Sequence, residues 1–499
     1  MPSYTLTNPR GDTVTVSSLP EFYSWRRRNY TLASGTDAAA VAAFGGAADN
    51  PGPLETYTGD ALKAAYVPRG QAFTGLMAGL RSGTSSVGMS LVGDSTGDAA
   101  DEWFYLVGSW LAGKFPAWTV QMRRWNDTAQ WFDRPLAIQT GPAGQRAIAL
   151  ATGATIAAVT SPVANPTGDL DAALWCKPTT WRTGTQTLIS KFGGSGNRSF
   201  RFQINASGVL SFDWTADGST LQSAASSVTA VPFAEGAAGW VRVQLDVDDG
   251  AGGHTVKFST STDGATWTQL GATVTRATGA TSVFASTWPY ELGARSGSSE
   301  PLIGGARLYE AEIREGIGGA TICPRLADDW QIPTGTGAPA IEGAPVLTLV
   351  GGSHPGAAIS YLNDPVRVKK MTPDFSQAVV MFSDSHNEQR TTGTPWATIL
   401  GGWVAAVRAR LPLAVPVVLT QNPRKAPAVL PEHVTRRAQT LLWAQANGVA
   451  AVDTYQAFLD SPLGLDTLVN SDGLHPTQGA GNTGSQLWAN TITAQLAAA

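Results

Sequence analysis

The sequence predicts an α/β fold in which a three-layer, parallel-sheet unit is interrupted by an inserted antiparallel β-sandwich. Short apolar runs alternate with helical periods at 81–144 and again at 336–499. Between them, at 145–335, apolar and polar residues alternate strictly and turn residues recur. Alternating strands and helices make a parallel sheet covered on both faces, whereas many short alternating strands make a sandwich. Residues 1–80 then form an N-terminal extension for attachment or packing.

The first element of the α/β unit is the apolar run Val87–Val92, which predicts a buried strand. A helical period follows from about Ala99 to Leu111. The turn between them, Gly93-Asp94-Ser95-Thr96-Gly97, has two glycines that permit unusual backbone angles. A serine at the carboxyl end of a strand is well placed to act as a nucleophile, and its N–H near a helix start can face an oxyanion. The alternative is an ordinary polar turn. Asp94, which precedes Ser95, is expected to hold the turn by hydrogen bonding to a backbone N–H.

The insert is predicted from alternation along several runs. Apolar side chains occupy every second position in Phe200–Ile204, Leu210–Trp214 and Val241–Val247, and Thr262-Asp263-Gly264-Ala265 is a hairpin turn. The segment Pro333–Pro345 is rich in turn residues and predicts the linker back to the α/β unit. Cys176 and Cys323 lie near the two ends of the insert, so they form either a disulfide or two buried free thiols.

The α/β pattern resumes after this linker. Strands are predicted at 346–350, 379–382, 415–420 and 449–452, and amphipathic helices at 396–407, 432–447 and the C-terminus. Ser95, Asn387 and Gln421 all follow predicted strands, where α/β proteins place their active sites.

A second motif, Asp472-Gly473-Leu474-His475-Pro476, places an aspartate three residues before a histidine in a loop. An imidazole can take the proton of a serine, and a carboxylate can hold the imidazole in the required tautomer. The motif therefore predicts a triad of Ser95, Asp472 and His475. Asp453, which also follows a strand, is an alternative carboxylate.

Together, Gly93-Asp94-Ser95 and Asp472–Pro476 resemble the nucleophile block and the Asp-x-x-His block of the SGNH (GDSL-type) esterase family. The resemblance implies a serine esterase without a cofactor or a metal. It also implies that Ser385-His386-Asn387-Glu388 is the block whose asparagine, Asn387, completes the oxyanion hole, although Ser385 and Glu388 depart from the family pattern. Its glycine block is assigned to Gly351–Gly356, with Gly356 as the backbone donor; the rival is Trp125-Asn126-Asp127-Thr128.

The remaining candidate residues are less directly tied to chemistry. His386, His354 and Gln421 are candidates for the substrate cleft, with a structural role as an equal alternative for His386. His433 begins a helix and is expected to be exposed.

The insert is similar to laminin-G/concanavalin-like domains through Leu170–Trp175 and Ser261–Trp267. This resemblance implies carbohydrate binding, and no calcium site can be assigned to its scattered acidic residues.

Composition limits the partners. Charged residues make up 14% and the net charge is −4, which argues against nucleic acid. No apolar run is long enough to cross a bilayer, two distant cysteines argue against zinc, and no secretory signal is visible after Met1.

The expected function is hydrolysis of acyl esters, O-acetyl esters above all, on a polysaccharide or cell-surface glycan. The alternative is a tail or surface adhesin that binds glycan without reacting. The expected location is extracellular or virion-associated, as in a bacteriophage tail with other tail proteins as partners. Deletion of 145–335 is expected to spare hydrolysis of a small ester and to weaken activity on a polymer.

Overall fold

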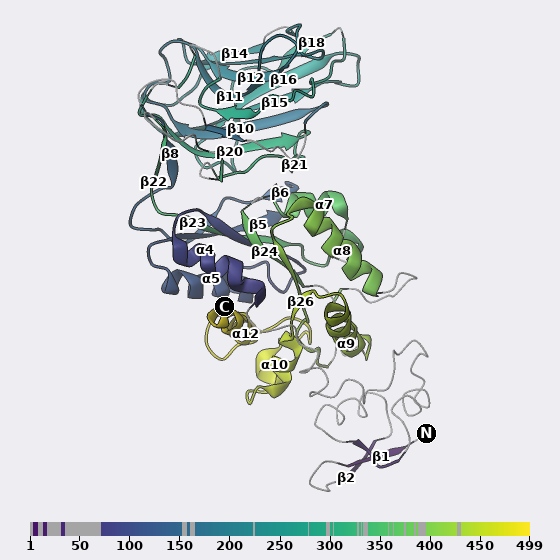
Figure 1. Ribbon diagram of the computed structural model, residues 1–499. Helices are drawn as coiled ribbons and strands as arrows, with labels where there is room; N and C mark the ends of the chain where they lie inside the picture. Colours follow the sequence, from purple (N-terminus) through teal and green to yellow (C-terminus); the bar gives the residue numbers. More distant parts are fainter. Residues whose placement is uncertain are drawn as a thin grey trace.

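The computed structural model of the protein combines a parallel α/β unit with a two-sheet β-sandwich (Figure 1). The residues that it describes are 3–7, 13–16, 31–34, 71–151, 157–159, 165–222, 225–277, 279–295, 300–302, 304–326, 329–330, 332, 338–357, 359–362, 364–373, 376–383, 386–387, 396–426 and 431–499. Within this part of the chain, none of the helices is both long and apolar enough to span a bilayer.

The α/β unit is organised around one sheet with the strand order β26-β25-β24-β4-β23-β5-β6 and with β7 paired to β5. The pairs from β26 to β5 are parallel, whereas β6 and β7 pair with β5 in antiparallel fashion. The strands are β4 (Val87–Gly93), β5 (Thr119–Asn126), β6 (Trp131–Phe132), β7 (Leu136–Gln139), β23 (Val346–Ser353), β24 (Gln377–Ser383), β25 (Val415–Leu419) and β26 (Ala450–Val452).

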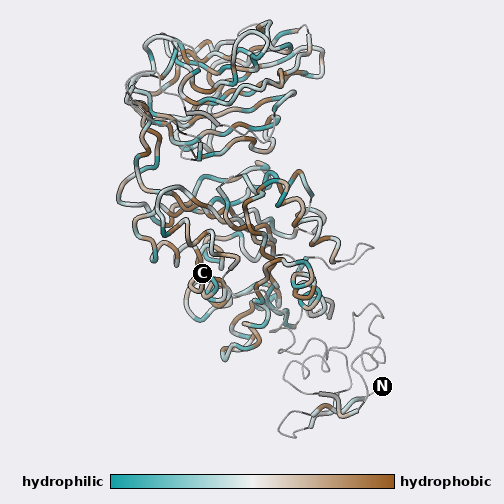
Figure 2. Tube along the Cα trace, in the orientation of Figure 1, coloured by the Kyte–Doolittle hydropathy of each residue, from teal (hydrophilic) through white to brown (hydrophobic). Residues whose placement is uncertain are grey.

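Helices cover both faces of this sheet, as the alternating pattern predicts. The helices are η2 (Gln71–Phe73, a 3-10 turn), α4 (Thr74–Ser82), α5 (Trp103–Lys114), α6 (Ile359–Leu362), α7 (Pro365–Met371), α8 (Trp396–Arg410), α9 (Pro431–Ala446), α10 (Thr454–Asp460), α11 (Leu465–Leu468) and α12 (Gly484–Ala498). Alternate residues of each strand point to opposite faces, and on β24 Val379 and Met381 pack with α4, α5 and α12 while Val380 and Phe382 pack with α7 and α8. The central strands are accordingly rich in buried hydrophobic residues, and their traces are largely brown in Figure 2.

The insert is a sandwich of two antiparallel sheets, with the orders β17-β16-β15-β10-β20-β8-β22 and β14-β13-β12-β11-β19-β9; β18 pairs with β16, and β21 with β20. The strands are β8 (Ala147–Ala149), β9 (Ala157–Val159), β10 (Leu170–Lys177), β11 (Gln186–Phe192), β12 (Arg198–Ile204), β13 (Val209–Trp214), β14 (Ala225–Ala230), β15 (Gly239–Asp246), β16 (His254–Ser261), β17 (Thr268–Gln269), β18 (Val274–Arg276), β19 (Tyr290–Leu292), β20 (Arg307–Glu315), β21 (Ala320–Thr321) and β22 (Ala340–Glu342).

The core of the sandwich is formed by the alternating apolar residues that predicted it. Phe202, Phe212 and Val243 are fully buried between the sheets. Cys176 and Cys323 are also buried there as free thiols, and burial raises the pKa of both. Strand β22 lies within the predicted linker and pairs with β8, so the two chain crossings between the units form one antiparallel ribbon.

The sandwich is joined to the α/β unit by buried charged groups as well as by this ribbon. Arg123 on β5 binds Glu312 on β20 at 3.2 Å, and both side chains are about 5% exposed. Arg314 also binds Glu312 and lies over the ring of Trp131 on β6. The outer face of β20 therefore packs against the β5–β6 side of the α/β unit, which lies next to the sandwich in Figure 1.

The N-terminal extension contains a small sheet with the order β2-β1-β3, formed by β1 (Tyr4–Thr7), β2 (Thr13–Val16) and β3 (Thr31–Leu32). The last residues of the predicted extension, from Gln71 on, belong to the α/β unit instead. Phe73, Leu76 and Leu80 are buried in the core of the α/β unit, so η2 and α4 are part of that unit.

Candidate active site

Ser95 lies in the turn that follows β4, the middle strand of the parallel sheet. The turn is held by Asp94, whose Oδ1 accepts hydrogen bonds from the backbone N–H and the hydroxyl of Thr96. This confirms the predicted turn-holding role of Asp94. Gly93 is required by packing, because a Cβ atom there would lie 2.9 Å from the carbonyl oxygen of Ser383.

The structure brings Ser95, His475 and Asp472 together in one chain of hydrogen bonds. Ser95 Oγ lies 2.7 Å from His475 Nε2, across 380 residues of sequence. His475 Nδ1 lies 2.6 Å from Asp472 Oδ2. With Nδ1 donating to the carboxylate, Nε2 is left as the acceptor for the serine hydroxyl.

The loop that carries Asp472 and His475 is fixed by its own hydrogen bonds. Asp472 Oδ1 accepts from the backbone N–H groups of Leu474 and His475, at 2.8 and 3.1 Å. Burial acts to raise the pKa of Asp472, but the bonds from His475 and from these N–H groups outweigh it and lower the pKa. Asp472 is therefore a carboxylate at neutral pH. The alternative carboxylate, Asp453, instead binds Arg437 at 2.6 Å and caps α10.

Asn387 follows β24, the neighbour of β4 in the sheet. Its Nδ2 atom is buried and has no hydrogen-bond partner among the groups that the structure describes. A buried amide donor without a partner is costly unless a ligand pairs with it. Ser385 and Glu388, the two departures from the family pattern, lie outside the described residues.

Gly356 lies in the exposed loop after β23 and has a left-handed φ of 73°. In the same loop, His354 stacks on Tyr361 at 4.5 Å between ring centroids, and its Nδ1 lies 3.7 Å from Asp127. The rival segment Trp125–Thr128 closes the β5–β6 hairpin, where Asn126 donates to Asp133 at 2.8 Å. The structure records no hydrogen bond between either segment and Ser95.

His386 and Gln421 are both buried and make structural hydrogen bonds. Gln421 contacts Asp94 and the backbone of His386, and His386 Nε2 lies 3.0 Å from the carbonyl oxygen of Asn422. The prediction that His433 is exposed was wrong. It is 3% exposed, because its ring packs 4.7 Å from that of His386 and binds the same carbonyl group.

Two features near the site were missed in the sequence. Asn422 is hydrogen-bonded to His386, His433 and Leu474. Only its position after a predicted strand marks it in the sequence. Glu102 is 4% exposed and caps Ala99 N–H at 2.9 Å. Burial raises the pKa of Glu102 to about 7, and the negative charge of Asp98 contributes to the same shift. No capping motif marks Glu102 in the sequence, because residue 99 is an alanine and Glu102 directly precedes the helix that begins at Trp103.

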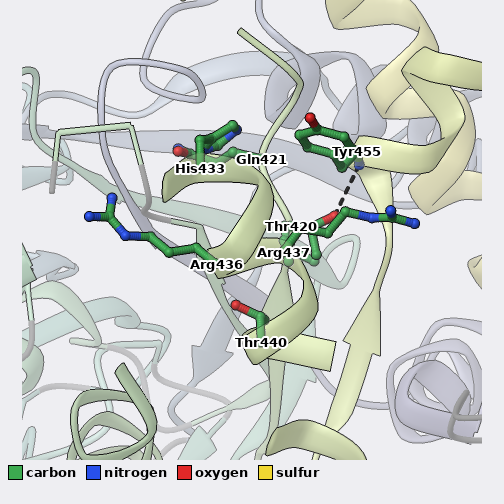
Figure 3. A pocket seen from close by; sticks show the side chains of 8 residues that line it. Thr420, Gln421, His433, Arg436, Arg437, Thr440 and Tyr455 are labelled. Carbon is green, nitrogen blue, oxygen red and sulfur yellow. Dashed lines mark hydrogen bonds between the residues drawn. The ribbon is translucent and has the colours of Figure 1, made fainter. Parts of the chain in front are cut away.

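A small pocket adjoins this region, and Gln421 is one of the residues that line it (Figure 3). It is lined by Leu419, Thr420, Gln421, His433, Arg436, Arg437, Thr440 and Tyr455. Ser95 and His475 do not line it, so it is separate from the triad. In the described part of the chain, no three His, Cys, Asp or Glu side chains are grouped so as to hold a metal ion.

No known protein family and no curated protein matches the sequence. Solved structures with some similarity include a peptidoglycan O-acetylesterase, at 10% identity over 86% of this chain and 95% of that chain, with a TM-score of 0.34. The lipase/acylhydrolase from Enterococcus faecalis is 13% identical over 30% of this chain and 75% of its own, with a TM-score of 0.24. The Ruminococcus gnavus IT-sialidase CBM40 bound to alpha2,3 sialyllactose is 15% identical over 34% of this chain and 90% of its own, with a TM-score of 0.24. Such low similarity does not assign a function, so the proposal below rests on the site itself.

Proposed function

We propose that the protein is a serine esterase that hydrolyses acyl esters, chiefly O-acetyl esters, on a polysaccharide or cell-surface glycan. The observation that carries the proposal is the continuous hydrogen-bonded chain Ser95–His475–Asp472, with distances of 2.7 and 2.6 Å. A serine, an imidazole and a carboxylate in this geometry form the arrangement that activates a hydroxyl for attack on a carbonyl group.

The reaction follows from the roles of these three groups. His475 Nε2 takes the proton of Ser95, Ser95 Oγ forms a bond to the ester carbonyl carbon, and His475 returns the proton to the leaving sugar oxygen. Water activated by His475 then cleaves the acyl-serine bond and releases the acid. The donors that stabilise the oxyanion are proposed to be the N–H of Ser95, the side-chain amide of Asn387 and the N–H of Gly356. The unpartnered, buried Nδ2 of Asn387 supports its part in this assignment.

The exposure of the site supports a polymer-borne substrate. The side chains of His475 and Asp472 are 33% and 44% exposed. An ester on a long glycan can reach an open triad of this kind without entering a deep channel. A long acyl chain would instead require an apolar tunnel.

The face of the sandwich that packs against the α/β unit also carries a group of aromatic side chains, of which Trp175, Trp267 and Tyr309 are partly exposed and Trp240 is buried. Trp175, Trp240 and Trp267 form a row with ring centroids 6.0 Å apart, and Tyr309 lies 4.5 Å from Trp175. A bulge in the pairing of β10 with β20 places Tyr309 beside Trp175 on this face. The row runs from β10 across β15 to the hairpin segment that follows β16, and because neighbouring strands lie about 4.8 Å apart, it is longer than one sugar ring. Aromatic faces present the apolar surface on which pyranose rings stack.

The test of the esterase proposal is release of acid by the wild type beside Ser95→Ala. A chromogenic acetyl ester and an O-acetylated bacterial polysaccharide are both assayed. We expect turnover by the wild type and background rates for Ser95→Ala. Equal background rates for both proteins on both substrates would contradict the esterase and favour the glycan-binding adhesin.

The test of the aromatic row is Trp175→Ala, compared with Trp110→Ala on the partly exposed side of α5. We expect Trp175→Ala to raise KM for the polymer by about tenfold, which corresponds to about 1.4 kcal/mol, and to leave the small ester unaffected. Trp110→Ala should change neither value. An unchanged KM for the polymer would contradict glycan binding at this row. The extracellular or virion-associated location and the tail-protein partners stay predictions from the sequence.

A further inference from the structure

Gln421 lies at the carboxyl end of β25, two strands from the nucleophile strand, and is 1% exposed. Its Nε2 donates to Asp94 Oδ2 at 2.7 Å. Its Oε1 accepts from the backbone N–H of His386 at 2.6 Å. One buried amide therefore joins the turn that carries Ser95 to the loop that carries Asn387.

The neighbouring residue, Asn422, extends this connection to the third loop of the site. Its carbonyl oxygen accepts from Nε2 of His386 at 3.0 Å and from Nε2 of His433 at 2.8 Å. Its Nδ2 donates at 2.8 Å to the carbonyl oxygen of Leu474, the residue before His475. Figure 3 shows His433 lying beside Gln421 where α9 begins.

Both imidazoles must donate through Nε2 to this one carbonyl group. Burial holds the pKa of His386 well below its ordinary value, and the nearby His433 lowers it further. His386 is therefore neutral at working pH and keeps one fixed tautomer. It orders the loop without taking part in proton transfer.

We propose that Gln421 and Asn422 are positioning residues that set the Asn387 amide and the His475 ring relative to Ser95 Oγ. The proposal rests on the proposed esterase function. Neither residue reaches the triad atoms; Gln421 acts through Asp94 and His386, and Asn422 acts through Leu474.

The chemistry of the two groups that Gln421 joins explains why an amide is required there. The Asp94 oxygen accepts and the His386 N–H donates, so the bridging side chain needs both a donor and an acceptor. Leucine offers neither and leaves two buried polar groups unpaired, which is costly. Without the bridge, the His386–Asn387 segment loses its anchor to the nucleophile turn, and a displacement of 1 Å in such a site lowers the rate by about a hundredfold.

The experiment compares Gln421→Leu with Gln377→Leu on a chromogenic acetyl ester. Gln377 is a matched control, because it is also a buried amide that joins two strands of this sheet. It accepts from Ser90 Oγ at 3.0 Å, toward the opposite end of β24 and β4. We expect Gln421→Leu to lower kcat by about ten- to a hundredfold with KM changed less than about twofold. Gln377→Leu should lower the melting temperature but keep kcat. Equal losses of kcat in both variants would overturn the proposal.

A double-mutant cycle separates positioning from general destabilisation. If Gln421 acts through Asn387, the double variant Asn387→Ala/Gln421→Leu should retain kcat within about threefold of Asn387→Ala alone. Losses that multiply would overturn the proposal. If Gln421→Leu melts below the assay temperature, Gln421→Asn is used in its place. Asparagine keeps a donor and an acceptor but is one methylene shorter, so it cannot span Asp94 and the His386 N–H together, and the same reduction in kcat is expected.

The outcomes also separate this inference from the proposed function. A wild type that is inactive on every ester contradicts the esterase itself. An active wild type whose kcat survives Gln421→Leu contradicts only the positioning role.

Discussion

Asn387 differs from the other amides near Ser95, because its Nδ2 is buried without a partner among the described groups, whereas Gln421 and Asn422 are hydrogen-bonded through theirs. A donor that is unpaired at rest is available to an oxyanion. We predict that Asn387→Ala lowers kcat for an acetyl ester by about a hundredfold or more with little change in KM. Steady-state kinetics check this, with Asn447→Ala at the exposed end of α9 as the control. Near wild-type turnover would show that Asn387 has no part in the oxyanion hole.

The sequence allowed some of these residues to be predicted and not others. Ser95 and the Asp472/His475 pair lie in local turn motifs, and the short spacing of the pair limits its geometry. The bridge from Gln421 to Asp94 spans 327 residues, so no local pattern marks it. His433 was expected at the surface because it begins a helix, but the long-range contact with His386 buries it.

At the scale of helices, α5 and α12 are held together by a stack of two fully buried tryptophans. Trp103 and Trp488 lie 5.1 Å apart with their planes within 1°. We predict that Trp488→Ala lowers the free energy of unfolding by about 3–5 kcal/mol, because it leaves a large cavity. Denaturant unfolding measures the change.

The control for this stack is Gln486→Ala on the exposed side of α12, which should change the free energy of unfolding by less than about 0.5 kcal/mol. Equal changes in the two variants would mean that α12 is held by something other than the stack.

The same helices show how far periodicity predicts an element. The apolar period placed α5 correctly, but the helix begins at Trp103 and not at Ala99. The reason is the Glu102 side chain, which accepts from Ala99 N–H and stabilises the turn before the helix. Strand β22 was missed because its three residues fall in a segment with the composition of a linker, and only pairing with β8 makes them a strand.

At the scale of the whole molecule, the contact between the two units depends on Glu312. Burial acts to raise the pKa of Glu312, but the charges of Arg314, Arg123 and Arg325 outweigh it and lower the pKa from 4.5 to about 2. A carboxyl group whose pKa is lowered in the folded state stabilises the protein fully at pH values above its ordinary pKa. This stabilisation is lost as the pH falls toward 2. We predict that the wild type loses stability between pH 4.5 and about 2 and that Glu312→Gln loses less over that range.

Chemical denaturation at several pH values checks this prediction. At neutral pH, Glu312→Gln should be less stable by about 3–5 kcal/mol, because buried arginines lose their partner. The control is Glu342→Gln, which removes the exposed pair with Arg307 at 2.8 Å and should cost less than about 1 kcal/mol. Parallel pH profiles for the wild type and Glu312→Gln would contradict the role of Glu312.

The composition of the two units was visible in the sequence, but their contact was not. Alternation identified the sandwich, yet no local pattern connects Arg123 with Glu312, which lie 189 residues apart in the sequence. Their burial also changes the meaning of the deletion of 145–335, which removes the partner of Arg123 along with the sandwich. Single substitutions such as Trp175→Ala therefore test glycan binding more cleanly than the deletion.

The order of strands in the parallel sheet also has a consequence for synthesis of the chain. Strand β4 pairs with β23. Along the chain, however, the entire sandwich lies between the end of β5 and the start of β23. At about 5–20 residues per second, the roughly 200 intervening residues take about 10–40 s to leave the ribosome. During that interval, β4 and its serine turn have neither of the two strands, β23 and β24, that flank them in the sheet. All strands of the sandwich are therefore synthesised before β23, β24, β25 and β26 of the parallel sheet.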